Sequence, residues 1–476
     1  MSFRQMIFKS SIAALGLSLA LISTIAQAKQ PNVIIVFTDD QGWEDLSSYG
    51  STTIATPRLD ELAQSGIQLN DFYVASSVCS ASRAALLTGR APVNNGVLGV
   101  YFPDTKGMKP SEITMAEVLK EAGYATAAIG KWHLGDQKES LPTGQGFDYY
   151  YGIPFSNDMF IGHSHSFAED VTFHQGYDLA KAKADQALVK KAGKKRAFIK
   201  KSGIKELVPI FENEQIIEYP AEQASLSKRY VDKAIDFINQ SNDSPFFVYL
   251  TPSMPHVPLF ASPEFKGKSK GGLYGDTVEE IDYHIGRLMD FLEAKDLRDN
   301  TILVFASDNG PWLGYGKHAG NAGPFSHGKF TNYEGGIRVP AIISWPTKIK
   351  QGQQSSEIVS ALDLLPTIAH YAKAELPKRT IDGHNIADYL EGKQSTLEHP
   401  NFLHFKNKVA GVRVGDWKYI RSGMAVYGKS GRTPNNEQEL LFNLKDDPAE
   451  QTNLADRFPE RVAELQTMVT TYESSL

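Results

Sequence analysis

The stretch Asn32-Val33-Ile34-Ile35-Val36-Phe37-Thr38-Asp39-Asp40 runs from an unbroken apolar segment directly into two adjacent carboxylates. A short continuous apolar run is typical of a strand that is buried on both faces of a parallel sheet. Three similar runs occur at residues 125–129, 245–250 and 301–306. Amphipathic helical segments lie between these runs, and strands that alternate with helices predict an α/β sandwich.

Two of the helical segments can be read directly from their residues. In residues 56–63, Thr56 is expected to cap the helix, Pro57 lies in its first turn, and Gly66 is expected to stop it. The second segment carries an apolar face made of Ile281, Ile285, Leu288, Met289 and Leu292. Such faces are suited to packing against a sheet.

Polar residues follow each of the four apolar runs. The first run leads to Asp39-Asp40 and the second to Lys131-Trp132-His133. The third leads through a short turn to His256, and the fourth to Asp308-Asn309. Any one of these endings would suit an ordinary turn. Because the carboxyl ends of parallel strands meet at one edge of an open sheet, the four together predict a ligand site there.

The carboxylates in this set predict a divalent metal ion. Adjacent Asp39 and Asp40 would repel each other in a buried site unless a cation lay between them, and Asp308 with Asn309 would complete an oxygen-only ligand set. Such ligands favour Ca²⁺ first and Mg²⁺ second, and they disfavour Zn²⁺. The remaining polar residues would surround a tetrahedral oxyanion, which indicates an anion-transfer site; they are Arg83, Lys131, Lys329, His133 and His256.

Cys79 is the only cysteine of the chain, and it precedes a helical segment rich in Ala and Leu. A single thiol cannot form an internal disulfide. The unpaired N–H groups and the positive dipole end of a helix N-terminus favour an anion, so the placement suggests a nucleophile. The alternative is a lone buried cysteine that acts as a small hydrophobe.

Residues 1–28 are interpreted as a secretory signal peptide. Arg4 and Lys9 precede an apolar stretch at residues 12–25, and Ala26-Gln27-Ala28 offers a cleavage site. An uncleaved membrane anchor is the alternative, although the stretch is short for a span, and no later segment is long and apolar enough to cross a bilayer. We therefore expect an exported protein, periplasmic or secreted, whose mature chain begins near Lys29.

The charge of the chain argues against a nucleic-acid partner. Cleavage removes two of the 49 basic residues and none of the 55 acidic ones, which leaves 47 against 55 and a net charge of −8. Without disulfides, a chain of this length must be held together by its apolar core. The sequence alone sets no oligomeric state.

Several further motifs give the chain a family resemblance. It resembles a type I, formylglycine-dependent sulfatase of the alkaline-phosphatase-like superfamily, of the arylsulfatase and polysaccharide sulfatase type. The resemblance runs almost from end to end. Its motifs are Cys79 to Arg90, Pro31-Asn32-Val33-Ile34 before Asp39-Asp40, Gly130 to Gly135, Gly152 to Ser156, Pro255-His256, Ser307 to Gly310, Lys329 with Glu334 to Pro340, and Asp416 to Tyr419 with Leu440 to Leu444 and Glu450 to Leu454.

The resemblance implies a fold and a cofactor. The fold would be a central, mostly parallel sheet between helices, with a smaller C-terminal subdomain of antiparallel sheet and helix. Cys79 would be oxidised to formylglycine by a formylglycine-generating maturation enzyme. One hydroxyl of the aldehyde hydrate would attack sulfur, and the other would later allow sulfate to leave as the aldehyde re-forms. Ala81 replaces the more common proline of this motif, which leaves open the maturation system that acts on it.

Residue roles also follow from the resemblance. Asp39, Asp40, Asp308 and Asn309 would hold the ion, with modified residue 79 as a further ligand next to Arg83. His133 would take the proton that triggers sulfate release, and His256 would assist the departing alkoxide. Lys131 and Lys329 would neutralise sulfate oxygens, and Ser156 would lie close to the hydrate or the sulfate.

Substrate choice would depend on loops outside this core. A sulfated carbohydrate or polysaccharide fragment is the expected substrate of such an exported enzyme. Candidate contacts are His163, His165, His174, Trp312, His318, His327, His404 and Arg413, with ordinary surface histidines as the alternative. The basic segment Lys181 to Lys205 could dock a polyanionic chain, or it could simply form a solvated face.

The expected division is a signal peptide at 1–28, a catalytic domain at 29–376 and a C-terminal α+β subdomain at 377–476. The segment 361–369 would close the large domain, short strands at 410–414 and 417–420 would follow, and a terminal helix would begin near Pro459. Two functions remain as alternatives to a sulfatase: a phosphodiesterase or phosphonate monoester hydrolase on the same scaffold, and an inactive sulfated-glycan-binding protein.

Overall fold

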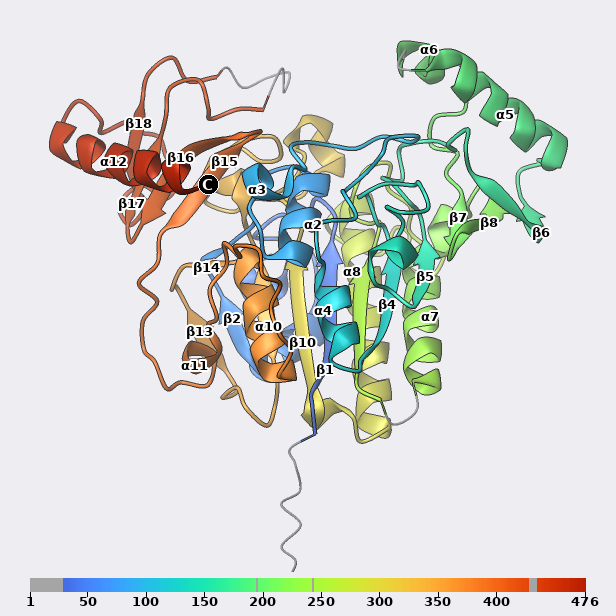
Figure 1. Ribbon diagram of the computed structural model, residues 1–476, viewed down its shortest axis with the longest axis horizontal. Coiled ribbons are helices and arrows are strands. Elements are labelled where there is room, and N and C mark those ends of the chain that lie inside the picture. The colour runs from blue at the N-terminus through green and yellow to red at the C-terminus, as the bar shows by residue number, and fades with distance from the viewer. Residues whose placement is uncertain (1–28, 194–195, 242–243, 428–434) are drawn as a thin grey trace, which may run out of the picture.

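A sheet of eleven strands forms the centre of the molecule in a computed structural model that describes residues 29–193, 196–241, 244–427 and 435–476 (Figure 1). The predicted signal peptide at 1–28 lies outside the described residues. In spatial order the strands are β13 (Gln353–Ser355), β2 (Ile67–Leu69), β12 (Ala341–Ser344), β10 (Thr301–Ser307), β1 (Asn32–Thr38), β9 (Phe246–Thr251), β4 (Ala125–Gly130), β5 (Tyr149–Gly152), β7 (Ile210–Glu212), β8 (Gln215–Tyr219) and β6 (Ser166–Phe173).

The four predicted strands are β1, β4, β9 and β10, and they lie side by side at the middle of the sheet. Their mutual pairings are all parallel, and β12, β2 and β7 provide antiparallel pairings toward the edges. Alternate side chains of β1 enter different cores, with Ile35 on one face and Ile34 on the other. This alternation explains why the run is apolar at every position.

Helices cover both faces of the sheet, so the predicted α/β sandwich is confirmed (Figure 1). One face is covered by α1 (Pro57–Gln64), α7 (Leu226–Gln240) and α8 (Gly272–Ala294). The other is covered by α2 (Cys79–Thr88), α4 (Met115–Glu121) and α10 (Leu364–Ala372). Short helix α3 (Pro92–Asn95) follows α2.

The predicted cap of α1 differs from the structure. Thr56 occupies the N-cap position, but its side chain makes no capping hydrogen bond. Its hydroxyl oxygen instead accepts a hydrogen bond from the N–H of Ser47 at 2.8 Å, which ties the preceding loop to the start of the helix. The buried residues Leu59, Leu62 and Ala63 hold α1 on the sheet.

A small antiparallel sheet packs against the last helix at the C-terminal end, as predicted. The sheet consists of β15 (Asn401–Phe405), β16 (Lys408–Val414), β17 (Trp417–Ile420) and β18 (Leu440–Asn443), and the helix is α12 (Pro459–Ser475). A three-stranded sheet and two short helices complete the main body, namely β11 (Arg338–Val339), β3 (Phe72–Tyr73), β14 (Val359–Ser360), α9 (Glu334–Ile337) and α11 (Ala387–Leu390).

Helices α5 (Leu179–Ala192) and α6 (Arg196–Lys201) project beyond the strand β6 edge of the main sheet (Figure 1). They contain most of the predicted basic segment, of which Lys194 and Lys195 lie outside the described residues. Among the described residues, none of the helices has the length and apolar character that a bilayer crossing requires.

Candidate active site

Buried carboxylates from two neighbouring strands meet at the carboxyl edge of the sheet. Asp39 and Asp40 follow β1, Asp308 and Asn309 follow β10, and the four residues are at most 3 % exposed. The Asp40 N–H donates to Asp308 Oδ1 at 3.2 Å, and the Asn309 amide donates to Asp40 Oδ1 at 2.7 Å. The parallel register of β1 and β10 therefore brings together the residues that the sequence predicted as a set.

Helix α2 presents Cys79 and Arg83 to this cluster. Cys79 is the first residue of the helix, so the predicted helix start is correct. One turn later, the fully buried Arg83 contacts Asp308 Oδ2 through Nε at 2.9 Å and through Nη2 at 2.8 Å. Single ligand atoms of Asp39, Cys79 and Asp308 lie within 4.8 Å of one another.

The environment of Cys79 does not favour a thiolate, in contrast to the expectation drawn from its helix position. Burial raises the pKa of the Cys79 thiol to about 11, because the loss of water outweighs the nearby positive charges of Lys131 and Lys329. An unmodified thiol would therefore remain protonated at neutral pH. The site is poorly suited to ordinary cysteine catalysis.

The oxygen atoms of the cluster fit a hard divalent cation. Asp39 Oδ1, Asp40 Oδ2 and Asn309 Oδ1 are buried and have no hydrogen-bond partner among the described residues. Burial raises the pKa of Asp308, and the neighbouring charge of Asp39 raises it further. Buried oxygens without donors and mutually repelling carboxylates are both relieved by a cation that accepts carboxylate and amide oxygens.

Two lysines pair with the first two carboxylates. Lys131 Nζ lies 2.5 Å from Asp39 Oδ2, and Lys329 Nζ lies 2.6 Å from Asp40 Oδ1. Burial alone would raise the pKa of Asp39, but Lys131 and then His256 lower it below its ordinary value. The Lys329 ammonium also lies 4.9 Å from the centre of the Trp312 ring. Two fixed ammonium groups beside a metal-type cluster can hold an anionic substrate.

His133 is buried and uncharged, and one of its ring nitrogens is available. Burial lowers its pKa well below the usual value, and the charges of Lys131 and Arg83 lower it further. Its Nε2 lies 3.1 Å from the Tyr101 carbonyl oxygen, and its Nδ1 has no hydrogen-bond partner among the described residues. A carbonyl can only accept, so Nε2 carries the proton and the Nδ1 lone pair can take another.

His256 lies next to Asp40, and Val257 and Asn157 orient its ring. Its Nδ1 lies 2.6 Å from the Val257 carbonyl oxygen and 3.1 Å from Asn157 Oδ1. Its Nε2 lies 3.6 Å from Asp40 Oδ2, and Ser156 Oγ lies 3.3 Å from its ring nitrogens. The Nδ1 position is occupied by acceptors, so Nε2 is the nitrogen that can exchange a proton with a ligand.

Two positioning groups were missed in the sequence. Asn157 directly follows Ser156 and orients His256, and its place in the same polar run could have indicated it. The carbonyl of Tyr101 sets the tautomer of His133, and no sequence signal marks a backbone oxygen.

Several predicted substrate contacts have other partners in the structure. Arg413 is buried between Asp71 and Tyr73, with Nη2 2.6 Å from Asp71 Oδ2, so it holds the C-terminal sheet rather than a substrate. His165 is also buried, with Nε2 2.8 Å from Asp136 Oδ2. Both substrate contacts stay predictions, but in the structure each side chain is buried against a carboxylate partner and not placed at a surface.

The other predicted contacts are divided between the site and more distant surfaces. Trp312 lies beside His256, with ring centres 5.8 Å apart. His163 pairs with Asp104 at 2.7 Å, and His174 lies 3.6 Å from Glu218. His327 packs on the Tyr333 ring at 4.3 Å, and His318 is exposed. His404 lines a separate cavity together with α12 residue Tyr472.

The fold and this site define a hydrolase of the alkaline-phosphatase-like superfamily, and known proteins identify its family. Residues 31–374 match the family described as Sulfatase, and residues 325–472 match the one described as N-sulphoglucosamine sulphohydrolase, C-terminal. Rat arylsulfatase G is 36% identical over 463 residues, which cover 92% of this chain and 85% of the relative. The chain therefore belongs to the type I sulfatases, enzymes that hydrolyse sulfuric esters.

Solved structures agree with this assignment. A structure from work on the metabolism of multiple glycosaminoglycans by Bacteroides thetaiotaomicron has a TM-score of 0.77 and 28% identity, and covers 94% of this chain and 100% of its own. The structure of Ps i-CgsB in complex with k-i-k-neocarrahexaose has a TM-score of 0.73 and 29% identity, and covers 94% and 93% of the two chains.

Proposed function

We propose that this sulfatase is exported and removes sulfate from carbohydrates, with a formylglycine derived from Cys79 and a bound Ca²⁺. The observation that carries the proposal is the set of buried oxygens of Asp39, Asp40 and Asn309, close to Cys79, that accept no hydrogen bond from any residue the structure describes. A raised thiol pKa supports conversion of Cys79, because the unmodified side chain would be a poor nucleophile.

The modified residue 79 and a divalent cation would supply the central chemistry. The hydrated aldehyde would supply a nucleophilic oxygen, and the cation, held by Asp39, Asp40, Asp308 and Asn309, would polarise that oxygen and neutralise charge. Mg²⁺ is the second choice for the ion. Maturation requires a formylglycine-generating enzyme in the producing cell.

The cationic side chains of the chain would bind and orient the sulfate group. Lys131 and Lys329 are positioned by Asp39 and Asp40 at the cluster, where they can contact sulfate oxygens. Arg83 fixes Asp308 Oδ2 through two nitrogens, and Oδ1, which accepts from the Asp40 N–H, keeps a second lone pair for the ion. Fixed charges of this kind stabilise the charge that develops during transfer.

Two histidines would divide the proton transfers. The lowered pKa of His133 keeps its ring neutral, and its Nδ1 has no hydrogen-bond partner among the described residues, so this nitrogen can accept the proton whose removal releases sulfate. His256 keeps one proton on Nδ1 toward the Val257 carbonyl oxygen, so it would act as an imidazolium whose second proton, on Nε2, passes to the departing alcohol oxygen, with Ser156 as a neighbouring hydroxyl. The two histidines have different neighbours, Tyr101 for His133 and Asn157 with Val257 for His256, so the two proton transfers would use separate groups.

The carbohydrate substrate is proposed from the relatives and from the sequence. One solved relative comes from work on glycosaminoglycan metabolism, and another was solved in complex with k-i-k-neocarrahexaose. The signal-like segment at 1–28 supports export to a compartment where sulfated polysaccharides occur, either the periplasm or the medium. The exposed His163 near Asp104 and the aromatic Trp312 are the proposed sugar contacts.

The test has two parts. Mass analysis of the peptide around Cys79 should show the aldehyde in protein produced with a maturation enzyme, and the cysteine without one. Matured protein is then incubated with defined sulfated oligosaccharides, and the released sulfate is assigned by position. Calcium-dependent release that is lost in Cys79→Ala supports the proposal. Turnover of phosphodiesters in preference to every sulfate ester would instead favour the phosphodiesterase hypothesis. Tight binding of sulfated oligosaccharides without release of sulfate would favour a glycan-binding protein.

A further inference from the structure

A cavity lies where the loops around α10 of the catalytic unit meet strand β15 and helix α12. Its volume is about 330 Å³. It is lined by the loop before α10, by the loop around residue 384, by residues that enter β15, and by α12. It shares no lining residue with the candidate active site. The cavity contains three histidines, His384, His399 and His404, and none of them has a part in the proposed reaction.

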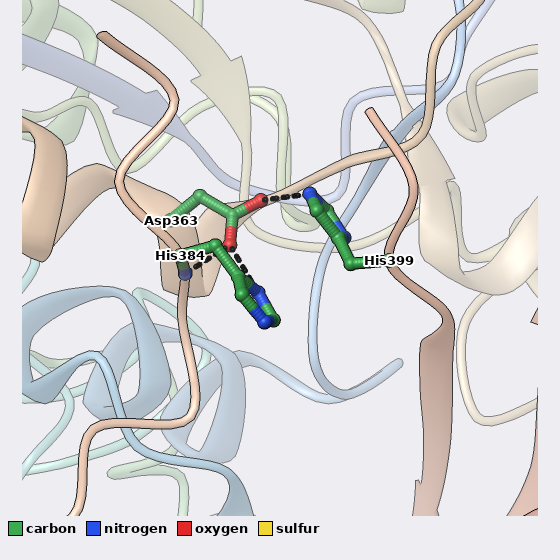
Figure 2. A group of neighbouring side chains, drawn as sticks. All are labelled: Asp363, His384 and His399. Atoms are coloured by element: carbon green, nitrogen blue, oxygen red, sulfur yellow. Dashed lines mark hydrogen bonds and ion pairs between the residues drawn. The ribbon is translucent and has the colours of Figure 1, made fainter. Parts of the chain in front are cut away.

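Asp363 directs one carboxylate oxygen toward each of two of these histidines, His384 and His399 (Figure 2). His384 Nδ1 is 3.7 Å from Asp363 Oδ1, and His399 Nε2 is 3.9 Å from Asp363 Oδ2. The ligand atoms of all three residues lie within 4.8 Å of one another. Two imidazoles and one carboxylate in such proximity form the donor set typical of a transition-metal site.

The carboxylate of Asp363 is held in place by backbone donors. Its Oδ2 accepts from the Ser360 N–H at 2.8 Å, and its Oδ1 accepts from the His384 N–H at 2.7 Å. Each carboxylate oxygen can accept a further interaction. Asp363 is 1 % exposed, so its position is determined by the fold. Such hydrogen bonds orient a metal ligand before the ion arrives.

Ring nitrogens in the cavity lack ordinary partners. His399 Nε2 and both ring nitrogens of His404 are buried and make no hydrogen bond within the described part of the chain. His404 is only 1 % exposed, and burial lowers its pKa to about 4. A buried neutral imidazole with unpaired nitrogens is costly unless it binds something. The cavity is therefore suited to an occupant that accepts nitrogen lone pairs.

We propose that Asp363, His384 and His399 form a second metal site, selective for Zn²⁺ or a divalent ion of similar preference. Tetrahedral ligands bound at about 2.0–2.1 Å lie roughly 3.3 Å apart, which is slightly closer than the two measured nitrogen-to-oxygen distances. The rings of His384 and His399 stack in parallel, with centres 4.4 Å apart and an angle of 6°. Both rings must tilt toward Asp363, because the lone pairs of parallel rings do not meet at one point.

The surroundings allow this movement and give the ion a path. The His384 side chain is 55% exposed, so its ring can rotate without disturbing the core, and the open cavity supplies the entry route. Nitrogen ligands favour Zn²⁺ over the Ca²⁺ proposed for the oxygen-lined active site. The two sites can therefore be filled separately in one molecule.

Occupancy of the site would join three separate segments. Asp363 precedes α10 of the catalytic unit, His384 lies in the following loop, and His399 lies two residues before β15. An ion held by all three would link the catalytic unit to the C-terminal sheet and would stabilise the folded state by mass action. This role does not depend on the catalytic reaction.

The test is titration of calcium-saturated full-length protein with Zn²⁺ and, as a spectroscopic probe, with Co²⁺. The wild type should bind one Zn²⁺ more than the His384→Ala variant, should show the visible absorption of Co²⁺ with nitrogen ligands, and should melt at a higher temperature with Zn²⁺. His384→Ala and His399→Gln should bind Zn²⁺ at least about 10-fold more weakly. His370→Ala, which removes an exposed histidine of α10, should match the wild type.

Each alternative result is decisive. Equal Zn²⁺ uptake by the wild type and both variants would place any binding elsewhere, for example at Cys79, and would overturn the proposal. Absence of Zn²⁺ binding by the wild type would also overturn the proposal and would leave Asp363, His384 and His399 as an ion-paired cluster. Because His384 is largely exposed, loss of binding in His384→Ala with an unchanged melting temperature of the zinc-free protein supports the site rather than a folding defect.

Discussion

At the scale of single residues, His133 shows how burial prepares a group for proton transfer. Its side chain has no exposure, its Nε2 proton is directed to the Tyr101 carbonyl, and Nδ1 remains available. Lys131 and Arg83 disfavour a second positive charge next to them. The lowered pKa therefore keeps the imidazole in its neutral, proton-accepting form at neutral pH.

Replacement of His133 by Ala should separate the two halves of the reaction. Release of the alcohol should persist as a burst, while steady-state kcat should fall by roughly 100- to 10,000-fold, because the later proton acceptor is missing. Rapid-mixing measurements of alcohol and sulfate release test this. His370→Ala, which removes an exposed histidine of α10, is the control. Equal slowing of the burst and the steady state would contradict the assignment.

The pH profile provides a second test of the same residue. The pKa of His133 is lowered, so its acceptor form is lost only as the pH falls through a value well below the ordinary histidine pKa. The acid limb of kcat should therefore lie below the ordinary histidine range. An acid limb at the ordinary histidine pKa would show that another group limits the reaction.

Cys79 should be unreactive when it has not been modified. Because burial raises its pKa to about 11 and leaves it 1 % exposed, alkylation of metal-free, unmatured protein should be slow at neutral pH and should still increase up to about pH 10. The rate is followed by mass spectrometry with iodoacetamide. Denatured protein, in which the thiol regains its ordinary pKa, is the control. Fast labelling of the native protein at neutral pH would refute the buried, protonated thiol.

The sequence predicted the site residues that directly follow a buried strand. Asp39, Asp40, Asp308 and Asn309 were grouped correctly because strand ends in a parallel sheet share an edge. Arg413 was not predictable, since its partners Asp71 and Tyr73 are distant in sequence and meet it only after the C-terminal sheet docks.

At the scale of elements, the end of β10 is held against α9 by close backbone contact. A Cβ on Gly310 would lie 1.8 Å from the Gly335 carbonyl oxygen. The Gly310 N–H also donates to the Gly336 carbonyl oxygen at 3.1 Å. Because Asp308 and Asn309 immediately precede it, this contact fixes the turn that presents two of the proposed metal ligands.

Gly310→Ala should therefore damage the metal site through its backbone. We expect destabilisation by about 1–3 kcal/mol, weaker calcium binding and lower kcat, because the turn must move to relieve the overlap. Gly314→Ala is a matched control, since the atoms nearest to its added Cβ would be those of the Trp312 ring, at an ordinary contact distance of 3.5 Å or more. Calcium-dependent melting curves measure the effect. Unchanged calcium response in Gly310→Ala would show that the turn does not depend on this contact.

Helix α5 offers a test of substrate docking. Ala182, Gln186 and Val189 face inward, whereas Lys181, Lys183, Lys190 and Lys191 are exposed. If this exposed face binds a polyanion, changing these lysines to Gln should raise KM for long sulfated chains and leave KM for small aryl sulfates unchanged. Steady-state assays on both substrates at low and high salt decide the matter. Equal effects on both substrates would mean that the lysines form only a solvated face.

Element positions were predictable because the apolar runs are long and bounded by polar residues. Strands β1, β4, β9 and β10 begin and end within one residue of the predicted runs. The predicted capping hydrogen bond of α1 was wrong because the Thr56 hydroxyl accepts from the Ser47 N–H instead. Sequence patterns do not show where the loop that contains Ser47 lies. The antiparallel edge strands are short and carry no comparable signal.

At the scale of the whole molecule, a buried charge network joins the C-terminal sheet to the catalytic unit. Lys418 of β17 lies 2.8 Å from Glu334 Oε1 in α9 and 2.8 Å from Glu450 Oε1 after β18. The Glu334 N–H donates to Glu450 Oε2 at 2.6 Å. Sequence could not reveal this network, and the domain boundary at 376 stays a prediction. Two carboxylates therefore share one ammonium in a dry interface, and they cannot both ionise without cost.

This sharing predicts a specific dependence of stability on pH. Burial raises the pKa of Glu450 to about 7, against an ordinary value of 4.5, while the charges of Lys418, Arg413 and Arg338 overcome burial and lower the pKa of Glu334 to about 2. The Glu450 contribution is complete below its unfolded pKa and is lost as the pH rises through about 7. The Glu334 contribution is present above its unfolded pKa and is lost only in strong acid.

Between about pH 5 and pH 8, the free energy of unfolding of the wild type should thus fall by about 3 kcal/mol relative to Glu450→Gln, whose neutral side chain keeps its place without titrating. Denaturant unfolding at the two pH values, followed by tryptophan fluorescence, measures the difference. Glu437→Gln, which changes an exposed carboxylate, should follow the wild type. Parallel pH dependence of the wild type and Glu450→Gln would contradict this prediction, because only a proton that Glu450 takes up on folding can make the two curves diverge. In that case the interface would be held by a fully ionised network.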